Sequence, residues 1–346
     1  MAEDKQELSS KLGRLCSIQE DGSVVCHLCA HGCSLKDGQR GICRVRENIA
    51  GRLVSLVYGR IVAESVDPVE KKPLFHVVPG TLSYSISTLG CNFRCDHCQN
   101  SSISQIKRNE DVLSSGVQRR PEDIVAMALK KGCRSISYTY VEPTIFFEFA
   151  YDCCTLAAEN GLKNIFVSNG YMSRNATDHL APLLSACNVD LKSFSDEFYK
   201  KFCGARLQPV LDNIALLKEK GVWVEVTTLV IPGLNDSDRE LTQIAQFLAS
   251  VDRTIPWHVS GFYPAYKMSD IPPTPLATLQ KARQIGLDNG LAFVYAGNRP
   301  GSGQEDTNCP GCGVTTISRY GFRIENMSLV EGCCPQCGFQ IPGVWL

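Results

Sequence analysis

Three cysteines near the first third of the 346-residue chain have the spacing of ligands to one metal centre. Cys91, Cys95 and Cys98 form a C-x3-C-x2-C pattern, so one short loop can present three thiolates to an iron–sulfur cubane, which usually takes four Cys ligands. Three ligands leave one iron open, much as a catalytic zinc keeps an open position, and the amine and carboxylate of a substrate could fill it. A structural zinc ion is the alternative, with His97 as a fourth ligand.

Two further C-x2-C pairs lie near the C-terminus, with a glycine after each pair. Pairs separated by about twenty residues predict a structural zinc site, and an auxiliary iron–sulfur cluster is the alternative. Cys333 could replace its neighbour in this set, although Cys334 has the better spacing. The intervening stretch Thr315–Ile324 predicts the hairpin strand of a zinc ribbon. The four predicted ligands are Cys309, Cys312, Cys334 and Cys337.

A third cluster, in the N-terminal region, has the pattern C-x2-C-x3-C-x9-C. This pattern slightly favours zinc, and His27 or His31 widens the choice of ligands. An iron–sulfur centre, giving an electron route or a second reaction site, is the alternative. The four cysteines are Cys26, Cys29, Cys33 and Cys43. Nearby basic side chains form either a solvated face or a docking surface for an acidic electron-transfer or substrate protein. They are Lys36, Arg40, Arg44 and Arg46.

The chain has 18 Cys, which poses a choice between disulfides and metal ligation. Disulfide-rich chains are usually short and secreted, whereas this one is long, begins without an apolar signal and groups its Cys at ligand spacing. We therefore expect metal ligation in a reducing cytoplasm. The Cys outside the clusters are predicted to be small buried apolar residues. They are Cys16, Cys133, Cys153, Cys154, Cys187 and Cys203.

Charge and hydropathy narrow the classes of function. The net charge of −1 provides no global attraction for nucleic acid or anionic lipid. No apolar run approaches the ~18–20 residues that a membrane-spanning helix needs. A cytoplasmic protein without a membrane partner is therefore expected, and nucleic-acid binding is disfavoured.

Short β-rich runs alternate with amphipathic helical stretches through the middle of the chain. This alternation predicts a parallel sheet with crossover helices. About six or seven units favour a full or partial (β/α) barrel over an open doubly wound sheet. The predicted strands are Tyr84–Leu89, Ser135–Tyr140, Asn164–Ser168, Asn188–Lys192, Val222–Ile231, Trp257–Tyr263 and Ala292–Ala296. Predicted helices run from Pro121 to Lys131, from Pro209 to Lys220, and from a cap at Asp236 or Ser237 to about Ser250. We predict an N-terminal Cys-rich lobe over residues 1–75, the barrel over 76–300 and a zinc-ribbon-like domain over 301–346.

Polar residues follow the predicted strands, and strand C-termini meet at one mouth of a barrel, where active sites form. Glu142 follows the second strand, and Asp190 and Lys192 lie at the fourth. A carboxylate and a cation of this kind suit a zwitterionic ligand, while a barrel-mouth ion pair or solvated charges are the structural alternative.

The segment Gly-Cys-Asn-Phe-Arg-Cys-Asp-His-Cys-Gln-Asn at residues 90–100 resembles the signature of the radical S-adenosylmethionine (SAM) superfamily. The chain is similar to pyruvate formate-lyase activating enzymes, and more narrowly to the radical SAM member of the AmmeMemoRadiSam system. The resemblance covers nearly the whole chain. Its matching stretches are Cys26–Arg46, Asp67–His76, Cys91–Gln105, Tyr138–Pro143, Val167–Gly170, Asp190–Lys192, Ile231–Asp236 and the Cys-rich tail.

The resemblance implies a role for each site residue. Cys91, Cys95 and Cys98 would hold a [4Fe–4S] cluster whose open iron chelates SAM. The remaining residues would lie around SAM. His97 occupies the position of an aromatic residue whose backbone meets adenine, Glu142 would contact the amino group, and Ser168 and Asn169 would lie near the ribose. Asp190 and Lys192 would hold the methionyl end and ribose, and His258 would lie in the same cavity without an assigned role. The chain has Tyr-Val-Glu where the family has Gly-Gly-Glu, which puts the local backbone path in question.

The family resemblance implies that SAM is cleaved reductively to a 5′-deoxyadenosyl radical, which abstracts hydrogen from a protein or partner-delivered substrate. It also implies a low-potential flavodoxin or ferredoxin-like electron donor, together with AMMECR-type and Memo-type companion proteins. A glycyl-radical activase is an alternative, weakened because 101–132 lacks the Cys-rich insertion of many activases. A zinc-rich binding or scaffold protein is the non-enzyme alternative, and nucleic-acid modification is disfavoured by the neutral charge.

Overall fold

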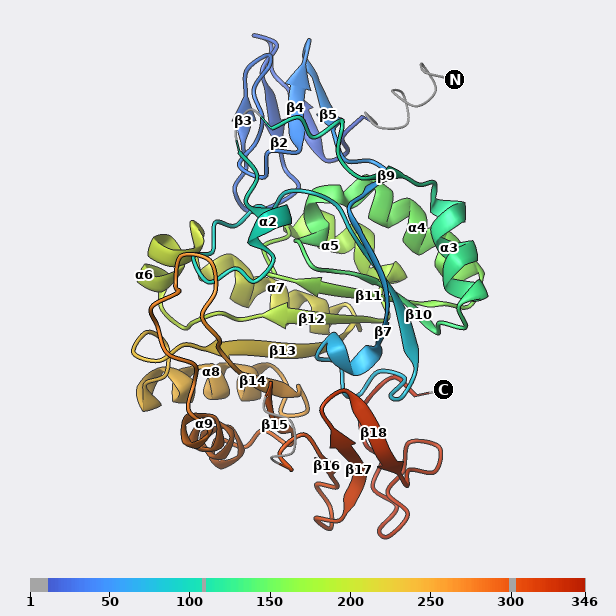
Figure 1. Cartoon of the computed structure of the whole chain (residues 1–346), viewed down its shortest axis with the longest axis vertical. Helices are drawn as coiled ribbons and strands as arrows, with labels where there is room; N and C mark the ends of the chain where they lie inside the picture. Colours follow the sequence, from blue (N-terminus) through green and yellow to red (C-terminus); the bar gives the residue numbers. More distant parts are fainter. Residues whose placement is uncertain (1–11, 108–109, 299–302, 346) are drawn as a thin grey trace.

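The computed structural model describes residues 12–107, 110–298 and 303–345 of the chain. A small lobe of short strands stands at one end, a sheet with its helices forms the middle, and a second small lobe stands at the other end (Figure 1). None of the described helices is both long and apolar enough to cross a membrane.

The central sheet has eight strands within the described residues, in the order β15-β14-β13-β12-β11-β10-β8-β7. Seven of them run parallel, and β7 pairs antiparallel with β8 at one edge. No pairing among the described residues joins the two outer strands, so the sheet is a partial barrel. The mostly parallel sheet with its helices confirms the predicted α/β class. The strands are β7 (Ala63–Pro68), β8 (Leu82–Ser87), β10 (Ser135–Tyr138), β11 (Lys163–Ser168), β12 (Ala186–Asp190), β13 (Trp223–Val230), β14 (Trp257–Gly261) and β15 (Val294–Gly297).

All seven predicted strands are present as the parallel part of this sheet. Sequence analysis missed β7, which lies within the stretch 1–75 predicted as the N-terminal lobe and yet pairs along its length with β8. Its sequence, Ala-Glu-Ser-Val-Asp-Pro, is half exposed and ends in proline. Such a strand gives a weak signal because β-propensity largely reports burial, and proline is tolerated at sheet edges.

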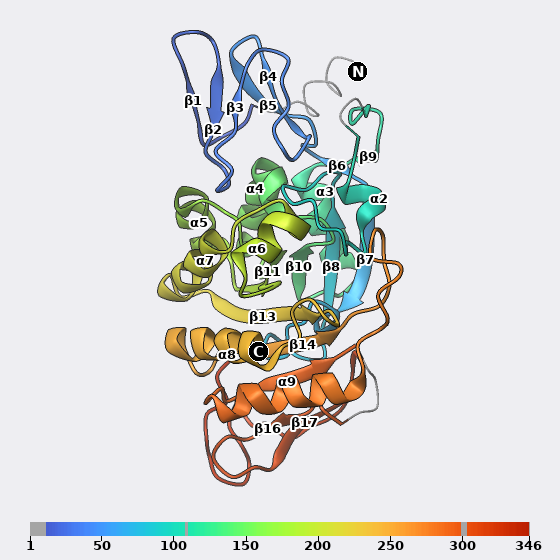
Figure 2. The ribbon, with the colours of Figure 1, turned by 90° about the vertical axis from the view of Figure 1, so that its left-hand side faces the viewer.

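The crossover helices pack on the strands that they connect, and Figure 2 shows α5, α7 and α8 in a column beside the sheet. Helix α8 buries Leu241, Ile244 and Leu248, and its cap is Ser237, whose Oγ accepts from the Glu240 amide at 3.3 Å. The longer helices are α3 (Pro121–Lys130), α4 (Phe147–Glu159), α5 (Arg174–Leu180), α7 (Gln208–Glu219), α8 (Asp238–Val251) and α9 (Leu276–Asp288). The short ones are η1 (Val69–Lys71), α2 (Ser101–Ser104), η2 (Pro143–Phe146), η3 (Ala181–Leu183), α6 (Asp196–Phe198) and the π-helix η4 (Tyr199–Cys203).

The N-terminal lobe consists of a three-stranded antiparallel sheet and a hairpin. Its buried residues Val24, Leu28 and Leu35 belong to the same apolar cluster as the central sheet, so the lobe shares the main core. The strands are β1 (Cys16–Ile18), β2 (Val24–Cys26), β3 (Ser34–Leu35), β4 (Arg46–Ile49) and β5 (Arg52–Ser55), followed by the short pair β6 (Arg60–Ile61) and β9 (Val117–Gln118).

The C-terminal lobe is a three-stranded antiparallel sheet of β16 (Thr307–Asn308), β17 (Thr315–Tyr320) and β18 (Arg323–Met327). The predicted hairpin is confirmed, because β17 pairs with β18. The lobe is attached to the body through buried polar contacts. Arg319 donates to the Phe75 carbonyl at 2.9 Å, and His76 contacts the Pro342 carbonyl at 2.7 Å.

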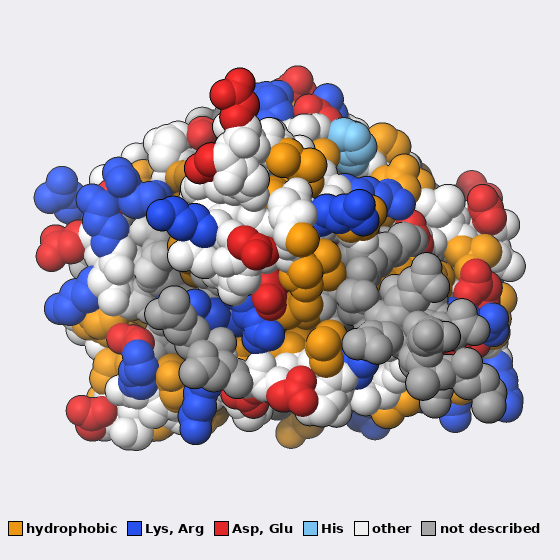
Figure 3. Space-filling model, turned by 90° about the horizontal axis from the view of Figure 1, so that it is seen from above, with side chains coloured by type: hydrophobic (Ala, Val, Ile, Leu, Met, Phe, Trp, Pro, Cys, Tyr) orange, Lys and Arg blue, Asp and Glu red, His pale blue; other side chains and the backbone are white. Residues whose placement is uncertain are grey.

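Basic side chains do not gather into one patch on the end of the molecule that carries the N-terminal lobe. Figure 3 shows lysines and arginines interspersed with acidic side chains over the described part of that face. This distribution is that of a solvated surface, and the docking of an acidic protein there remains a prediction. The prediction is wrong for Arg46, which is only 2% exposed because it pairs with Glu148 in the interior.

Five of the six Cys outside the clusters are buried, as predicted. The exception is the half-buried Cys16, whose Sγ lies 3.6 Å from the Gly13 carbonyl oxygen.

A buried ion pair joins the N-terminal lobe to helix α4. The Arg46 guanidinium makes two hydrogen bonds, of 2.7 and 3.0 Å, to the Glu148 carboxylate, and both side chains are at most 2% exposed. The backbone amide of Arg14 donates to the same carboxylate at 2.6 Å. Because each charge is desolvated, loss of one partner leaves the other unpaired in the interior.

We therefore expect Arg46→Ala to lower the free energy of unfolding by about 3–5 kcal/mol, the cost of leaving a buried charge unpaired. Urea unfolding followed by far-UV circular dichroism measures this change. The matched control is Arg323→Ala, because the Arg323 side chain is 76% exposed and its pair with Glu325 is at the surface. The control should change stability by less than about 0.5 kcal/mol. Equal effects of the two substitutions would contradict an anchoring role for Arg46.

Candidate active site

The loop Cys91–Cys98 follows β8 and has no regular secondary structure. It begins after Gly90, whose φ is +90° and where a Cβ would lie 2.6 Å from the Cys43 carbonyl oxygen. Only glycine fits at this close approach of the N-terminal lobe. His31 of the same lobe makes a 2.8 Å hydrogen bond through Nε2 to the Asn92 carbonyl. The N-terminal lobe therefore supports one side of the loop.

The π-helix η4 supports the other side of the loop. The backbone amide of Arg94 donates to the Cys203 carbonyl at 2.7 Å, and that of Asp96 donates to the Phe202 carbonyl at 2.9 Å. The buried Phe93 ring packs edge-on against Tyr171. The loop has no helix or sheet hydrogen bonds within itself, so these backbone hydrogen bonds to η4 hold its conformation.

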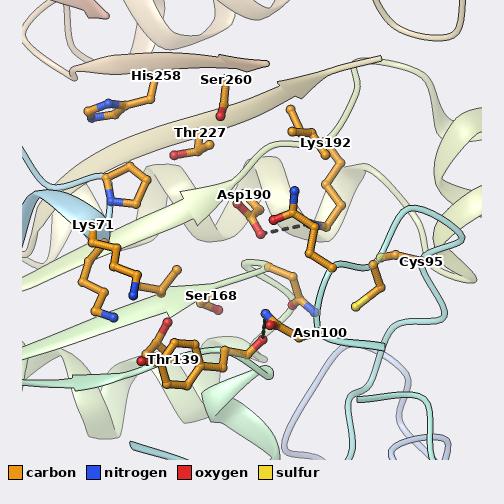
Figure 4. A pocket seen from close by; sticks show the side chains of 18 of the residues that line it. Lys71, Cys95, Asn100, Thr139, Ser168, Asp190, Lys192, Thr227, His258 and Ser260 are labelled. Atoms are coloured by element: carbon orange, nitrogen blue, oxygen red, sulfur yellow. Dashed lines mark hydrogen bonds and ion pairs between the residues drawn. The ribbon is translucent and has the colours of Figure 1, made fainter. Parts of the chain in front are cut away.

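A cavity of about 490 Å³ lies between this loop and the ends of the parallel strands. All ten residues of the predicted cluster and SAM site line it. They are Cys91, Cys95, His97, Cys98, Glu142, Ser168, Asn169, Asp190, Lys192 and His258. Figure 4 shows Cys95 and Lys192 on one side of the cavity, with Lys71 and His258 on the opposite side. The structure thus brings the predicted residues together, while the ligand that each contacts remains a prediction.

The thiols of the loop are spread more widely than one zinc ion requires. The sulfurs of Cys91, Cys95 and Cys98 do not all lie within 4.8 Å of one another. Tetrahedral zinc with Zn–S bonds of about 2.3 Å separates its sulfurs by about 3.8 Å. Burial raises the pKa of the Cys91 and Cys98 thiols, and metal ligation would favour their thiolate forms. This donor set fits a multi-iron cluster better than a single ion.

His97 has the properties of a residue that faces a ligand. Burial, with a smaller contribution from Lys192, lowers the pKa of His97 to about 3, so the imidazole is neutral at neutral pH. Neither ring nitrogen has a hydrogen-bond partner among the described residues. Buried polar atoms are nearly always paired, so both nitrogens are available to a group bound in the cavity.

Sequence analysis missed a neighbour of the loop, Cys203, which it predicted only as a buried apolar residue. The structure brings ligand atoms of Cys95, His97 and Cys203 within 4.8 Å of one another, and all three are buried. A hydrogen bond with Cys203 and burial together raise the pKa of Cys95. Cys203 does not line the cavity, so a metal bound by this trio would lie behind the loop rather than facing a substrate.

Glu142 joins the ends of two neighbouring strands. Its carboxylate accepts from the Asn169 amide at 2.7 Å, from the Ser168 hydroxyl at 2.9 and 3.1 Å, and from both the amide and the hydroxyl of Thr144. Burial raises the pKa of Glu142, and these hydrogen bonds oppose that rise. Because its oxygens are already engaged, Glu142 holds Ser168 and Asn169 in position at the cavity wall.

Asp190 and Lys192 form an ion pair at the end of β12, with 2.9 Å between Lys192 Nζ and Asp190 Oδ2. Burial alone would lower the pKa of Lys192, but the nearby Asp190 and Cys95 raise it. The ammonium therefore stays charged beside the cluster loop. The structural alternative of a barrel-mouth ion pair is present, and both partners face the cavity.

His258 belongs to a buried network that reaches beyond the cavity. Its Nε2 lies 2.6 Å from the carboxylate of Glu225, which also accepts from the amides of Phe75 and His76 at 2.9 and 2.8 Å. Burial alone would raise the pKa of Glu225, but the hydrogen bond from His258 lowers it below its usual value. This network links the floor of the cavity to Phe75 and His76, which also contact the C-terminal lobe.

Tyr140 stands where the related family has the first glycine of Gly-Gly-Glu, and the structure shows the backbone path at this position. It adopts φ of +66°, the left-handed conformation that glycine takes readily and that costs other residues roughly 1–2 kcal/mol. Its hydroxyl donates to Asp67 at 2.7 Å, and Asn100 Nδ2 donates to its carbonyl at 2.9 Å. These contacts hold a bulky residue in the conformation expected of glycine.

Two lysines of the cavity were also missed by sequence analysis. Lys71 and Lys72 share the carboxylate of Asp67 at 2.8 and 2.6 Å, and the Lys72 ammonium lies 4.7 Å from the centre of the Tyr140 ring. Both line the cavity, and Figure 4 shows Lys71 on the side away from Cys95. Only their place in the matched stretch Asp67–His76 could have signalled them, because adjacent lysines usually mark a solvated surface.

The C-terminal lobe brings four thiols together at its end. Cys309 and Cys337 sulfurs lie 3.5 Å apart, and those of Cys312 and Cys334 lie 3.7 Å apart. All four lie within 4.8 Å of one another, so the arrangement can hold one tetrahedral metal ion. Cys333 is excluded from the group and contacts Gln340 instead.

Comparisons with known proteins show what this chain is similar to. The model of the radical SAM superfamily matches residues 85–245. An uncharacterized protein of Methanocaldococcus jannaschii is 44% identical over 325 residues, which cover 93% of this chain and 96% of that protein. The pyruvate formate-lyase-activating enzyme of Streptococcus mutans is 21% identical over 57% of this chain and 81% of its own. A radical SAM methyltransferase from Sphaerobacter thermophilus, 17% identical, shares the fold with a TM-score of 0.50 over 64% of this chain and 67% of that one.

The role of Cys203 can be separated from that of the loop thiols. We expect Cys203→Ser to keep the wild-type iron content after anaerobic reconstitution, because Cys203 lies outside the cavity. Cys98→Ser is the matched comparison and should lose about four iron atoms per chain, one cubane. Iron and sulfide analysis checks both variants. Loss of iron from Cys203→Ser with retention in Cys98→Ser would instead identify the Cys95, His97 and Cys203 trio as the metal ligands.

Proposed function

The chain belongs to the radical SAM superfamily, and we propose that Cys91, Cys95 and Cys98 hold the [4Fe–4S] cluster with which it cleaves SAM to modify a protein or partner-delivered substrate. One observation carries the proposal: the three thiols lie on one loop at the edge of a cavity that the other predicted SAM contacts also line. Three thiolates leave one iron open for the amine and carboxylate of SAM.

A cluster bound there would supply the one electron needed to break a C–S bond of SAM, which would give methionine and a 5′-deoxyadenosyl radical able to take a hydrogen atom from the substrate. The chain itself positions and shields the reactants. Lys192 offers a cation for the SAM carboxylate, and His97 offers two unpartnered nitrogens for adenine. Glu142 acts through Ser168 and Asn169, which it holds at the cavity wall.

The substrate is proposed to enter from the side of the cavity opposite Cys95 (Figure 4). That side carries Lys71 and His258, and the C-terminal lobe contributes Glu305 and Phe322 to the lining. Because the lobe forms part of the wall, it both shapes the substrate end and limits the access of water to a reactive radical.

Activation of a glycyl-radical enzyme is the second candidate function, and similarity to the pyruvate formate-lyase-activating enzyme of Streptococcus mutans favours it. Residues 101–132 hold no Cys, unlike the Cys-rich insertion of many activases. A low-potential flavodoxin or ferredoxin-like protein is the proposed electron donor. AMMECR-type and Memo-type proteins are the proposed companions, on the sequence resemblance alone.

The ion proposed for the C-terminal lobe is zinc. The sulfur separations of 3.5 and 3.7 Å match the ~3.8 Å edge of a tetrahedral Zn–S4 site. A closed set of four thiolates is typical of structural zinc, which would stiffen the lobe that lines the substrate end of the cavity.

The central test is the formation of 5′-deoxyadenosine by anaerobically reconstituted protein given dithionite and SAM. Wild type should form it, and Cys95→Ala should fall to background because one cluster ligand is lost. Cys133→Ser is the matched control, since Cys133 is buried away from the cavity, and it should retain activity. Zinc in place of iron at the central loop, with no 5′-deoxyadenosine from any variant, would support the zinc-rich scaffold protein instead.

Zinc at the C-terminal lobe is tested by metal analysis of Cys312→Ser, which should lose about one zinc per chain while keeping its iron, because three thiolates no longer close the site. The neighbouring thiol of Cys333 provides the control, and Cys333→Ser should keep its zinc. An unchanged zinc content in Cys312→Ser, or a loss of iron from it, would refute the assignment.

A further inference from the structure

Four thiols of the N-terminal lobe surround one small cavity. Cys26 ends β2, Cys29 and Cys33 lie in the loop between β2 and β3, and Cys43 precedes β4. All four line a cavity of about 20 Å³, which also touches Asn92 of the catalytic loop. The sequence pattern of this cluster leaves zinc and an iron–sulfur centre open, and the spacing of the sulfurs bears on the choice.

The sulfurs of this cluster are spaced differently from those of the C-terminal lobe. The four C-terminal sulfurs all lie within 4.8 Å of one another, whereas no three of the N-terminal sulfurs do. A zinc ion would draw its thiolates to about 3.8 Å and leave no space between them. A cubane places its thiolates on separate corners and therefore needs both wider spacing and a space at the centre.

Gly41 keeps part of this space open. A Cβ at this position would lie 3.7 Å from the sulfurs of both Cys33 and Cys43. Its backbone does not have the positive φ that would by itself demand glycine. The missing side chain therefore matters for the room between two thiols rather than for the turn.

Hydrogen-bond donors are also arranged around the sulfurs. The backbone amides of His31, Ile42 and Val45 lie near the thiols of Cys29, Cys33 and Cys43, respectively, where they favour the thiolate forms and lower the pKa, against the larger effect of burial. The side chain of Asn92 lines the cavity, is 1% exposed, and has an Nδ2 without a partner among the described residues. Donors of this kind stabilise metal-bound thiolates and bridging sulfides.

We propose that Cys26, Cys29, Cys33 and Cys43 hold a second four-iron cluster rather than a zinc ion. Because four thiolates ligate all four irons, this cluster has no open site for SAM, and its chemistry is electron transfer. Its cavity shares Asn92 with the loop of the catalytic cluster, and Gly90 of that loop packs against the Cys43 carbonyl. The second cluster would therefore lie directly against the first.

The experiment uses a full-length chain in which Cys91, Cys95 and Cys98 are all replaced by alanine, so it does not depend on the proposed catalytic cluster. After anaerobic reconstitution with iron and sulfide, this protein should retain about four iron and four sulfide per chain and the Mössbauer spectrum of a cubane. Adding Cys29→Ser and Cys43→Ser should remove that iron. Adding Cys16→Ser instead should not, since Cys16 belongs to the same lobe but does not line the cavity.

A milder variant guards against loss of folding in the double substitution. Gly41→Ala keeps all four thiols and meets only ordinary contacts at 3.7 Å, so the chain should fold with an unchanged circular dichroism spectrum. It should nevertheless bind less than half of the iron, because the methyl group occupies cluster space. The proposal is overturned if the triple-alanine protein holds no iron, if its iron survives loss of Cys29 and Cys43, or if the N-terminal thiols hold zinc instead.

Discussion

The whole site depends on a loop that cannot fix its own shape. Residues 91–98 form neither helix nor strand, and three of them must hold their thiols toward a cavity. The shape is imposed from both sides, by His31 and the close approach at Gly90 on one side, and by the carbonyls of Phe202 and Cys203 on the other. Because these contacts already fix the loop backbone, binding of a cofactor does not have to order it, and that conformational entropy is not lost on binding.

Buried charge is the second constraint, and each buried charge has a partner that ties distant segments together. Arg46 and Glu148 join the N-terminal lobe to α4. Glu225 joins His258 at the cavity floor to Phe75, whose carbonyl accepts from Arg319 of the C-terminal lobe. At the cavity itself, Asp190 keeps Lys192 charged. Because unpaired buried charges cost several kcal/mol, these pairs fix how the lobes and the sheet are arranged around the site.

The sequence predicts most of the fold and the contents of the cavity, for identifiable reasons. The parallel strands are short β-rich runs that alternate with helical stretches, and polar residues at the ends of such strands necessarily meet at one edge. Glu142, Ser168 and Asp190 could therefore be placed together without knowledge of the loops. The edge strand β7 escaped because it is half exposed and polar.

Other features could not be predicted because they depend on contacts between segments far apart in the chain. Cys203 reaches Cys95 across more than a hundred residues, and its own neighbourhood contains no ligand spacing. The left-handed conformation of Tyr140 depends on Asp67 and Asn100. The difference between the two outer Cys clusters is likewise one of sulfur spacing in three dimensions, which C-x2-C patterns do not encode.

The most direct test of the account is whether SAM binds the cluster through its amine and carboxylate. Electron–nuclear double resonance of the reduced protein, with SAM labelled with 15N at the amine and 17O at the carboxylate, measures that contact. The account predicts hyperfine coupling from both labels to the cluster of Cys91, Cys95 and Cys98, absent when these residues are alanine. A reduced cluster at this loop that shows no coupling to either label at saturating SAM would contradict it.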